Sequence, residues 1–423
     1  MKIAIAGAGI GGLAAALSLH AAGFRDVSVF ESAEHLDLIG AGLNILPNAV
    51  RELDELGLLC SLREKAVETS ELVMLNRFGN IIWQESRGLS AGYRWPQLSI
   101  SRAALHSVLL KAVQERLGPD SVVLRSPIEG AYENRDGKVQ VQFSSLSKYA
   151  GETFDALIGA DGINSAVRSS LYPDEGEPPC DGRTIFRGVS WVKEYVSGRS
   201  MFVLGDDVRR LVIYPIEADQ AKGMVRLNWV AACPSEESRS FASRNERARA
   251  QDVLNVFGDW LPPGVDLPEL INSAGSISEY PMIDRDPLPR WSFGGITLLG
   301  DAAHAMYPAG SMGATQAIMD ARVLARKIAL FGNPAEGFAA YESDRRPQMT
   351  ELQARNRSLG PEAVISIAHC RAPNGFREID SVIPEEERKE ISRVYAEAAK
   401  LDVHEVNLRP SLSVGSILEA ESQ

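Results

Sequence analysis

Three glycines near the N-terminus have the spacing of a loop that binds a pyrophosphate. Gly7, Gly9 and Gly12 follow the pattern G-x-G-x-x-G, in which glycine permits a tight turn, a close backbone approach to phosphate and close helix packing. Glu31 follows a short apolar segment, where its carboxylate is placed to accept a hydrogen bond from an adenosine ribose hydroxyl. The pattern predicts a dinucleotide site with the cofactor-binding residues Gly7, Gly9, Ile10, Gly11, Gly12 and Glu31.

The segments around these glycines have the order that such a site requires. Residues 2–6 predict a buried strand, residues 13–22 a helix and residues 27–30 a second strand that ends at Glu31. The start of the helix offers free N–H groups and a partial positive charge, which suit a diphosphate. A chance glycine turn, which is the alternative, does not account for this order of elements.

Two aspartates also follow predicted strands. Asp161 comes just after the strand predicted at residues 154–159, and Asp301 comes just after the one at residues 296–299. A carboxylate at the end of a strand can accept hydrogen bonds from sugar-like hydroxyls. Taken alone, each aspartate is better explained as the cap of a helix.

Composition and charge limit the class of protein. The chain has 423 residues, 45% of them hydrophobic and 24% charged, as in globular proteins, and its length predicts more than one domain. The net charge of −12 argues against nucleic acid or an anionic membrane as a partner. The four cysteines show no C-x-x-C spacing, and no segment approaches the roughly 18 apolar residues of a membrane span. We therefore expect reduced thiols, no metal site, and a cytoplasmic protein.

The order of predicted elements changes near residue 171. Before it, we expect a loop at residues 40–45, helices at 47–56 and 102–115, and strands at 71–76, 81–83, 122–124 and 139–143. Residues 171–290 read as alternating strands, interrupted by one helix at 245–257. Long helices are predicted at 313–331, 336–356 and 385–401, before an irregular tail.

Taken together, three motifs make the chain resemble the single-component flavoprotein aromatic hydroxylases, the class typified by para-hydroxybenzoate hydroxylase. They are the glycine motif, the run from Asp161 through Gly162 to Arg168, and Gly300-Asp301-Ala302-Ala303-His304. The resemblance extends to about Arg345-Arg346-Pro347. It is strongest to the phenazine-carboxylate monooxygenase branch, through Phe186-Arg187-Gly188-Val189, Met306-Tyr307-Pro308 and the run of residues 280–289.

The resemblance implies an α/β fold and four segments. A Rossmann-like FAD-binding domain (1–171 and 295–360) is interrupted by a β-sheet substrate domain (172–294) and followed by a C-terminal helical extension (361–423).

The resemblance also implies roles for individual residues. Arg102 matches an arginine near the flavin chain, Asp161 and Arg168 match a motif that touches FAD and the transient NAD(P)H, and Asp301 matches the acid that bonds the ribityl chain. Pro308 matches a residue whose backbone lies near the reacting flavin carbon. After this proline the class usually has the run G-Q-G-x-N. Here the run is Ser311-Met312-Gly313-Ala314-Thr315, which keeps the glycine at Gly313 but lacks the glutamine and the asparagine. Gly313 and Ala314 are therefore expected to contact the flavin ring through backbone amides.

In this class NADH or NADPH reduces non-covalently bound FAD, and O2 then forms a C4a-hydroperoxide that hydroxylates an aromatic ring. The resemblance thus implies a monooxygenase for a small aromatic or N-heteroaromatic acid, with or without loss of CO2, working as a monomer or homodimer. Two other functions stay open. One is an NAD-dependent dehydrogenase, and the other is a flavin-binding protein that sequesters a ligand without turnover.

Four further residues have two interpretations each. Tyr214 is either a substrate-facing hydroxyl or part of the sheet core, and Asn44 lies either beside the flavin ring or in a structural role. Arg187 either holds the sheet together, which we favour, or binds an acidic substrate. His304 is a tempting base, but we expect it to support the loop around Asp301.

Overall fold

A computed structural model describes residues 1–36, 41–144, 147–193, 196–235 and 246–414. Its first sheet is mostly parallel and begins at the N-terminus. The six strands, in their order across the sheet, are β19 (Ser292–Phe293), β20 (Ile296–Leu298), β12 (Ala156–Gly159), β1 (Lys2–Ala6), β2 (Asp26–Phe30) and β8 (Val122–Val123).

The parallel strands end together at one edge of this sheet. β1 pairs in parallel with β2 and with β12, and β12 pairs in parallel with β20. Each of these four strands is followed within three residues by one of the predicted site residues, which are Gly7, Glu31, Asp161 and Asp301. The fold therefore brings the three motifs of the sequence to the same edge.

Helix α1 (Ile10–Ala21) covers this sheet and packs against α4 (Arg102–Leu117) and α9 (Gly313–Phe331). Most of α1 is buried, and its run of small alanines lets the neighbouring helices approach closely. Gly12 has no room for a side chain, because a Cβ there would overlap the carbonyl oxygen of Gly7. That glycine is what lets the helix start so close to β1.

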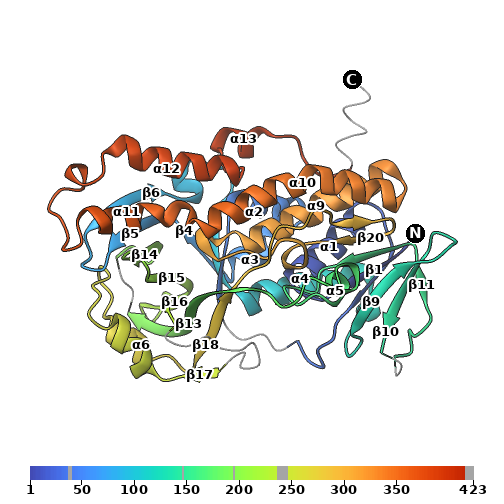
Figure 1. Cartoon of the computed structure of the whole chain (residues 1–423), viewed down its shortest axis with the longest axis horizontal. Helices are drawn as coiled ribbons and strands as arrows, with labels where there is room; N and C mark the ends of the chain where they lie inside the picture. Colours follow the sequence, from blue (N-terminus) through green and yellow to red (C-terminus); the bar gives the residue numbers. More distant parts are fainter. Residues whose placement is uncertain (37–40, 145–146, 194–195, 236–245, 415–423) are drawn as a thin grey trace.

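The second large sheet has eight strands and faces the end of the first (Figure 1). Every neighbouring pair is antiparallel except β14 with β5, which is parallel. In order across the sheet they are β17 (Glu246–Ala248), β18 (Ile277–Ile283), β13 (Cys180–Lys193), β16 (Met224–Pro234), β15 (Arg210–Asp219), β14 (Ser200–Gly205), β5 (Glu71–Asn76) and β6 (Ile81–Ser86).

The two faces of the eight-stranded sheet carry different clusters. Trp229, Phe257 and Trp260 belong to a buried cluster on the face covered by α6 (Ala250–Phe257) and α7 (Leu267–Asn272). Tyr214, on β15, belongs to a second cluster that includes residues of α11 (Ala363–Arg371). This second face is the one that meets the first sheet.

Two smaller sheets complete the described part of the fold. Two three-stranded sheets, in order across each sheet, consist of β3 (Gly42–Ile45), β7 (Gln97–Ser101) and β4 (Ala66–Thr69), and of β11 (Thr153–Phe154), β10 (Val139–Phe143) and β9 (Ile128–Glu133). The Gly42 N–H donates a hydrogen bond to Asn228 Oδ1 of β16 at 2.7 Å. β3 is thereby fixed to the eight-stranded sheet.

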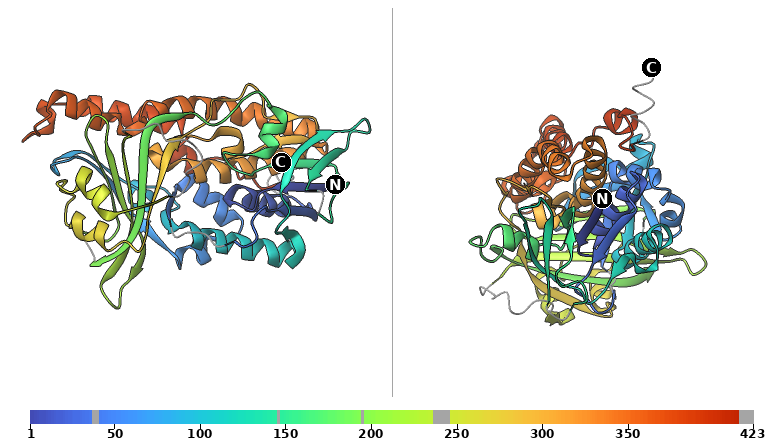
Figure 2. Two further views of the ribbon diagram at one scale, coloured as in Figure 1. Left: turned by 60° about the horizontal axis from the view of Figure 1, so that its bottom comes forward. Right: turned by 90° about the vertical axis from the view of Figure 1, so that its right-hand side faces the viewer.

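Helices in the C-terminal third of the chain run along one side of the molecule (Figure 2). They span the region from the parallel sheet to the eight-stranded sheet. They are α9, α10 (Pro334–Arg357), α11, α12 (Glu385–Ala398) and α13 (Val403–Leu408). The remaining helices are α2 (Pro47–Glu55), α3 (Leu59–Arg63), α5 (Ala166–Leu171) and α8 (Asp301–His304). None of the helices in the described ranges has the length and hydrophobicity needed to cross a membrane.

The structure confirms the mixed α/β fold, and the helix predicted at residues 313–331 has those bounds. The loop expected at residues 40–45 is wrong in its described part, because Gly42–Ile45 forms β3 by pairing with β7; Gly40 lies outside the described residues. The helix expected at 245–257 begins only at Ala250, because residues 246–248 pair with β18; Asn245 is not described. The strand expected at 154–159 is interrupted at Asp155, and α13 lies in the tail expected to be irregular.

The domain boundaries at residues 171, 294 and 360 stay a prediction. The eight-stranded sheet takes β5 and β6 from residues 71–86, so it is not built from residues 172–294 alone.

Replacing Gly12 with alanine should destabilise the apoprotein. The added Cβ forces α1 away from β1, and such overpacking costs about 1–3 kcal/mol in the free energy of unfolding. Gly9→Ala is the matched control, because a Cβ at Gly9 meets no atom within 4 Å and its φ of −72° suits alanine. Urea unfolding measures both, and equal midpoints would contradict the role given to Gly12.

Candidate functional site

One cavity of about 930 Å³ runs from the carboxyl edge of the parallel sheet to the face of the eight-stranded sheet. Its volume is at the upper end for ligand sites, as a large cofactor together with a substrate requires. Of the predicted site residues, the cavity is lined by Gly7, Gly9, Ile10, Gly11, Glu31, Asn44, Arg102, Asp161, Tyr214, Asp301, Pro308, Gly313 and Ala314. Gly12 and Arg168 do not line it.

The glycine loop and Glu31 form one end of the cavity. Glu31 accepts hydrogen bonds from the backbone N–H groups of Ala8 and Ala33, each at 2.8 Å. Gly7 has a φ of +94°, which favours glycine and allows the sharp turn out of β1. The carboxylate of Glu31 is thus held in place beside the loop.

His106 supports the same loop and was not identified from the sequence. Its Nε2 lies 2.7 Å from the carbonyl oxygen of Ala8, and the side chain is buried on α4. Burial lowers the pKa of His106, so the ring is favoured in its neutral form. A lone histidine in a helical pattern carried no signal that could have placed it there.

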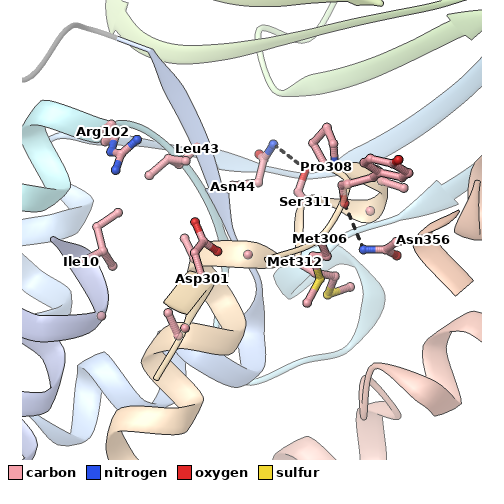
Figure 3. A pocket seen from close by; sticks show the side chains of 18 of the residues that line it. Ile10, Leu43, Asn44, Arg102, Asp301, Met306, Pro308, Ser311, Met312 and Asn356 are labelled. Carbon is pink, nitrogen blue, oxygen red and sulfur yellow. Dashed lines mark hydrogen bonds between the residues drawn. The ribbon is translucent and has the colours of Figure 1, made fainter. Parts of the chain in front are cut away.

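Asp161 and Asp301 lie on neighbouring strand ends but have different surroundings. Burial raises the pKa of Asp161, although its carboxylate accepts hydrogen bonds from the Ser165 hydroxyl and from Val167 N–H at 3.2 Å. Asp161 therefore lines the cavity and also stabilises the start of α5. Asp301 is exposed to the cavity, and no hydrogen bond occupies its carboxylate within the described residues. Figure 3 shows it between Ile10 and the loop at Pro308.

A buried charged cluster lies beneath Asp301. His304 Nε2 is 2.6 Å from Asp320 Oδ2, and Arg345 Nε is 2.7 Å from Asp320 Oδ1. Burial opposes the charge of Asp320, but His304 and Arg345 outweigh it and lower its pKa to about 2. The Gly300 N–H also lies 3.2 Å from the same carboxylate. The cluster fixes the segment that carries Asp301 to α9 and α10, and His304 has a supporting position.

Arg168 holds this segment from the other side. Its guanidinium donates to Glu175 Oε2 at 2.7 Å, to the Ala302 carbonyl at 3.0 Å and to the Asp286 carbonyl at 3.2 Å. These contacts position α8 rather than face the cavity.

The segment from Tyr307 to Ser311 forms the middle of the cavity wall. Asn356 Nδ2 donates to the Tyr307 carbonyl at 3.1 Å, and Asn44 Nδ2 lies 3.4 Å from Ser311 Oγ (Figure 3). Gly310 and Ser311 have φ values of +66° and +58°. This backbone turn therefore depends on side chains outside the loop.

The eight-stranded sheet forms the other end of the cavity. Tyr214 is buried in an apolar cluster and also lines the cavity, and the substrate-facing role of its hydroxyl stays a prediction. Burial raises the pKa of its hydroxyl to about 12, which keeps it protonated at neutral pH. Among described residues, no hydrogen bond occupies that hydroxyl.

Arginines at this end of the cavity differ in their partners. Arg87 pairs with Glu85, Arg183 with Asp181, and Arg210 Nε lies 3.6 Å from Glu362 Oε2. Arg187 has no acidic partner within 4 Å among the described residues. Its Nε is buried without a hydrogen bond, and its guanidinium carbon lies 5.9 Å from the centre of the Tyr280 ring.

The chain is similar in sequence to known proteins along most of its length. A family model described as the FAD binding domain matches residues 1–356. The phenazine 1,6-dicarboxylic acid hydroxylase PhzS of Lysobacter antibioticus is 42% identical over 363 residues, covering 84% of this chain and 89% of that protein. The 6-hydroxynicotinate 3-monooxygenase of Pseudomonas fluorescens is 30% identical over 363 residues, covering 83% and 89%.

A solved structure shares the fold. Klebsiella pneumoniae HpxO, complexed with FAD and uric acid, superposes with a TM-score of 0.74 at 23% identity and covers 95% of this chain and 96% of that chain.

The residues present fit FAD. Gly9 leaves open space above the loop, Arg102 lines the cavity beside it, and within the described residues no hydrogen bond occupies the Asp301 carboxylate, which can therefore accept from hydroxyl groups. Figure 3 shows Arg102 and Leu43 on the same side of the cavity as Ile10.

Replacing Glu31 with alanine should weaken FAD binding by about 1–3 kcal/mol, the cost of losing a hydrogen bond to a charged group. Glu34→Ala is the matched control, because Glu34 is exposed and does not line the cavity. Equilibrium titration of the apoproteins with FAD measures both. Equal affinity in the Glu31 variant and the wild type would remove Glu31 from the site.

Replacing Asp320 with asparagine should lower the free energy of unfolding at neutral pH by about 3–5 kcal/mol, because Arg345 and His304 lose their buried anion. Since the folded pKa is about 2 and the unfolded value is about 3.9, Asp320 stabilises the fold above pH 4, and this contribution is lost as the pH falls towards 2. The free energy of unfolding, measured by denaturation at several pH values between 2 and 7, should therefore depend less on pH in the variant than in the wild type. Asp344→Asn, which breaks only the half-exposed pair with Lys327, should change stability by less than about 1 kcal/mol.

Proposed function

The chain belongs to the FAD binding domain family and is a flavin-dependent aromatic monooxygenase, and from this premise we propose that its substrate is a small aromatic or N-heteroaromatic acid. Named relatives act on phenazine 1,6-dicarboxylic acid, 6-hydroxynicotinate and 3-hydroxybenzoate. The observation that carries the proposal is Arg187, the arginine at the substrate end of the cavity without an acidic partner in the described chain. A carboxylate is the group that a guanidinium without an acidic partner binds best.

Residues at the cofactor end of the cavity each bind a different part of FAD. Gly7, Gly9, Ile10 and Gly11 hold the diphosphate through backbone groups at the start of α1, and Glu31 binds the ribose. Arg102 lies along the flavin chain.

Asp301 would bind the ribityl hydroxyls, and Asp161 lines the same cavity at the end of the neighbouring strand. The backbone from Pro308 to Ala314 and the amide of Asn44 border the flavin ring. When bound and reduced by NADH or NADPH, FAD activates O2 for transfer of one oxygen atom to the aromatic ring.

Residues at the substrate end bind and orient the ring. Arg187 holds the carboxylate, and the Tyr214 hydroxyl donates to a ring substituent, because its raised pKa keeps the proton in place. Leu72, Met74 and Val203 line the same part of the cavity with apolar surface. This apolar surface excludes water. Exclusion of water favours transfer of oxygen to the aromatic ring over release of H2O2.

We also propose that O2 is the co-substrate, that the protein works as a monomer or homodimer, and that it resides in the cytoplasm. All four cysteines are free thiols, which favours a reducing compartment.

The proposed function is tested by adding 3-hydroxybenzoate, 6-hydroxynicotinate or phenazine carboxylates to the FAD-loaded enzyme. We expect an aromatic acid to stimulate NAD(P)H oxidation and to gain the mass of one oxygen atom, or of one oxygen in place of CO2. Amides of the same acids are the controls. Binding without turnover would favour the sequestering protein, and equal stimulation by the amides would contradict an acid substrate.

Replacing Arg187 with methionine should raise the KM for the acid roughly 10- to 100-fold, the size expected for hydrogen bonds between charged groups. The KM for the neutral amide should change little, and FAD binding should be unaffected. Arg226→Met is the matched control, because Arg226 lies on the same sheet, outside the cavity, and pairs with Glu217 at 3.3 Å. An unchanged KM for the acid would return Arg187 to a structural role.

A further inference from the structure

Helix α12 contributes to the cavity wall, although it follows the segment matched by the family model. The match ends at residue 356, and the cavity is also lined by Ser392, Tyr395 and Ala396 of α12. Of these three side chains, Tyr395 is the one whose hydrogen bonds reach the wall segment from Tyr307 to Ser311. The C-terminal part of the chain therefore contacts the backbone that borders the flavin ring in the proposed function.

The hydroxyl of Tyr395 has two acceptors. It lies 3.2 Å from the carbonyl oxygen of Ala309 and 3.0 Å from Asn356 Oδ1, and it donates its single proton towards them. Tyr395 and Asn356 are both buried. The hydroxyl therefore holds the wall segment directly at Ala309 and also contacts Asn356, which bonds the same segment.

Two glycines make room for the ring of Tyr395. A Cβ on Gly310 would overlap the tyrosine hydroxyl, and a Cβ on Gly360 would lie 2.8 Å from its Cε2. The two glycines have φ values of +66° and +51°, which favour glycine in any case. The ring is thus packed directly between two backbone segments, which set the position of its hydroxyl.

The Tyr395 hydroxyl also determines which way the Asn356 amide faces. Because the hydroxyl is the donor, the amide oxygen faces it, and Nδ2 donates to the Tyr307 carbonyl at 3.1 Å (Figure 3). Within the described residues, no other donor bonds this amide oxygen. A half-turn of the amide would set its oxygen against the Tyr307 carbonyl, and two acceptors without a proton between them repel each other.

The hydroxyl remains a donor at any pH at which the enzyme is assayed. Burial raises the pKa of the Tyr395 hydroxyl, and the nearby charge of Glu362 acts in the same direction. Its proton therefore stays available to Asn356 and Ala309, and the contacts do not depend on ionisation of the tyrosine.

We propose that Tyr395 is a positioning residue for hydroxylation, whose hydroxyl fixes the backbone of Tyr307 and Ala309, directly and through Asn356, and thereby limits the formation of H2O2. The inference rests on the proposed function, because it takes this wall segment to border the flavin ring. Loss of the two bonds loosens the segment and admits water. The two electrons of NAD(P)H, with two protons, then leave with O2 as H2O2, and the aromatic ring is not hydroxylated.

The test compares Tyr395→Phe with the wild type in the FAD-loaded enzyme. Tyr341→Phe is the matched control, because Tyr341 is also buried and its hydroxyl donates to a main-chain carbonyl, that of Leu298, at 3.2 Å, outside the cavity. The ratio of H2O2 to hydroxylated product is measured with the aromatic acid that the substrate screen identifies. Visible circular dichroism of the bound flavin is recorded without any aromatic compound.

We expect Tyr395→Phe to raise the ratio of H2O2 to product roughly fivefold, the effect of one lost hydrogen bond, and to change the flavin dichroism. The KM for the acid should change little, because Arg187 is untouched. Tyr341→Phe should lower the temperature of thermal unfolding but keep the wild-type ratio and dichroism. A residue that only stabilised the fold would behave like Tyr341.

A second pair of variants tests the route through Asn356. Asn356→Leu removes the amide, and Tyr395→Phe combined with Asn356→Leu removes both partners of their hydrogen bond. Because the two side chains share this bond, the increase in the ratio for the double variant should fall at least about twofold below the product of the two single increases. A double variant that reaches the full product would show that Tyr395 does not act through Asn356.

The proposal is overturned if Tyr395→Phe keeps the wild-type ratio of H2O2 to product, or if Tyr341→Phe raises the ratio equally. Thermal unfolding shows whether Asn356→Leu folds, and if it does not, Tyr395→Phe decides alone. If no aromatic acid is turned over, the proposed function fails. The flavin dichroism of Tyr395→Phe then decides, and a spectrum identical to that of the wild type overturns the role of Tyr395.

Discussion

Parallel pairing around β1 is the constraint on which the rest of the structure depends. Because β2 and β12 pair with β1 in the same direction, and β20 with β12, their carboxyl ends meet at one edge. Residues as far apart as Gly7 and Asp301 become neighbours of one cavity through this pairing alone. Ligands bind at this edge of α/β sheets because loops and helix N-termini converge there.

The second sheet supplies the other end of the cavity that begins at the edge of the parallel sheet. Tyr214 and Arg187 come from β15 and β13, the two strands that flank β16 in this sheet, and the bond from Gly42 to Asn228 fixes β3 to β16. The buried cluster around Asp320 then fixes the Asp301 segment against α9 and α10. The two ends of the cavity are therefore held by separate layers.

Much of the fold and of the cofactor end could be predicted from the sequence, because glycine spacing and acids at strand ends are local patterns. Asn44 and Tyr214 were also identified as candidates, and both line the cavity. The pairing of His304 and Arg345 with Asp320 could not be predicted from the sequence. It depends on how α9 and α10 pack against the segment that carries His304, and not on residues nearby in the sequence. The same reason applies to β3, whose strand character comes from its pairing with β7.

The parallel pair of β14 with β5 has a consequence for the exchange of parts between related proteins. Residues 172–294 contribute six of the eight strands, and β5 and β6 are supplied from residues 71–86. A chimaera that exchanges only residues 172–294 would place a foreign β14 against the host's β5, so side chains on two independently diversified strands would have to match. The unit that forms the second sheet is therefore discontinuous, and consists of the hairpin 71–86 together with the segment from β13 to β18, residues 180–283.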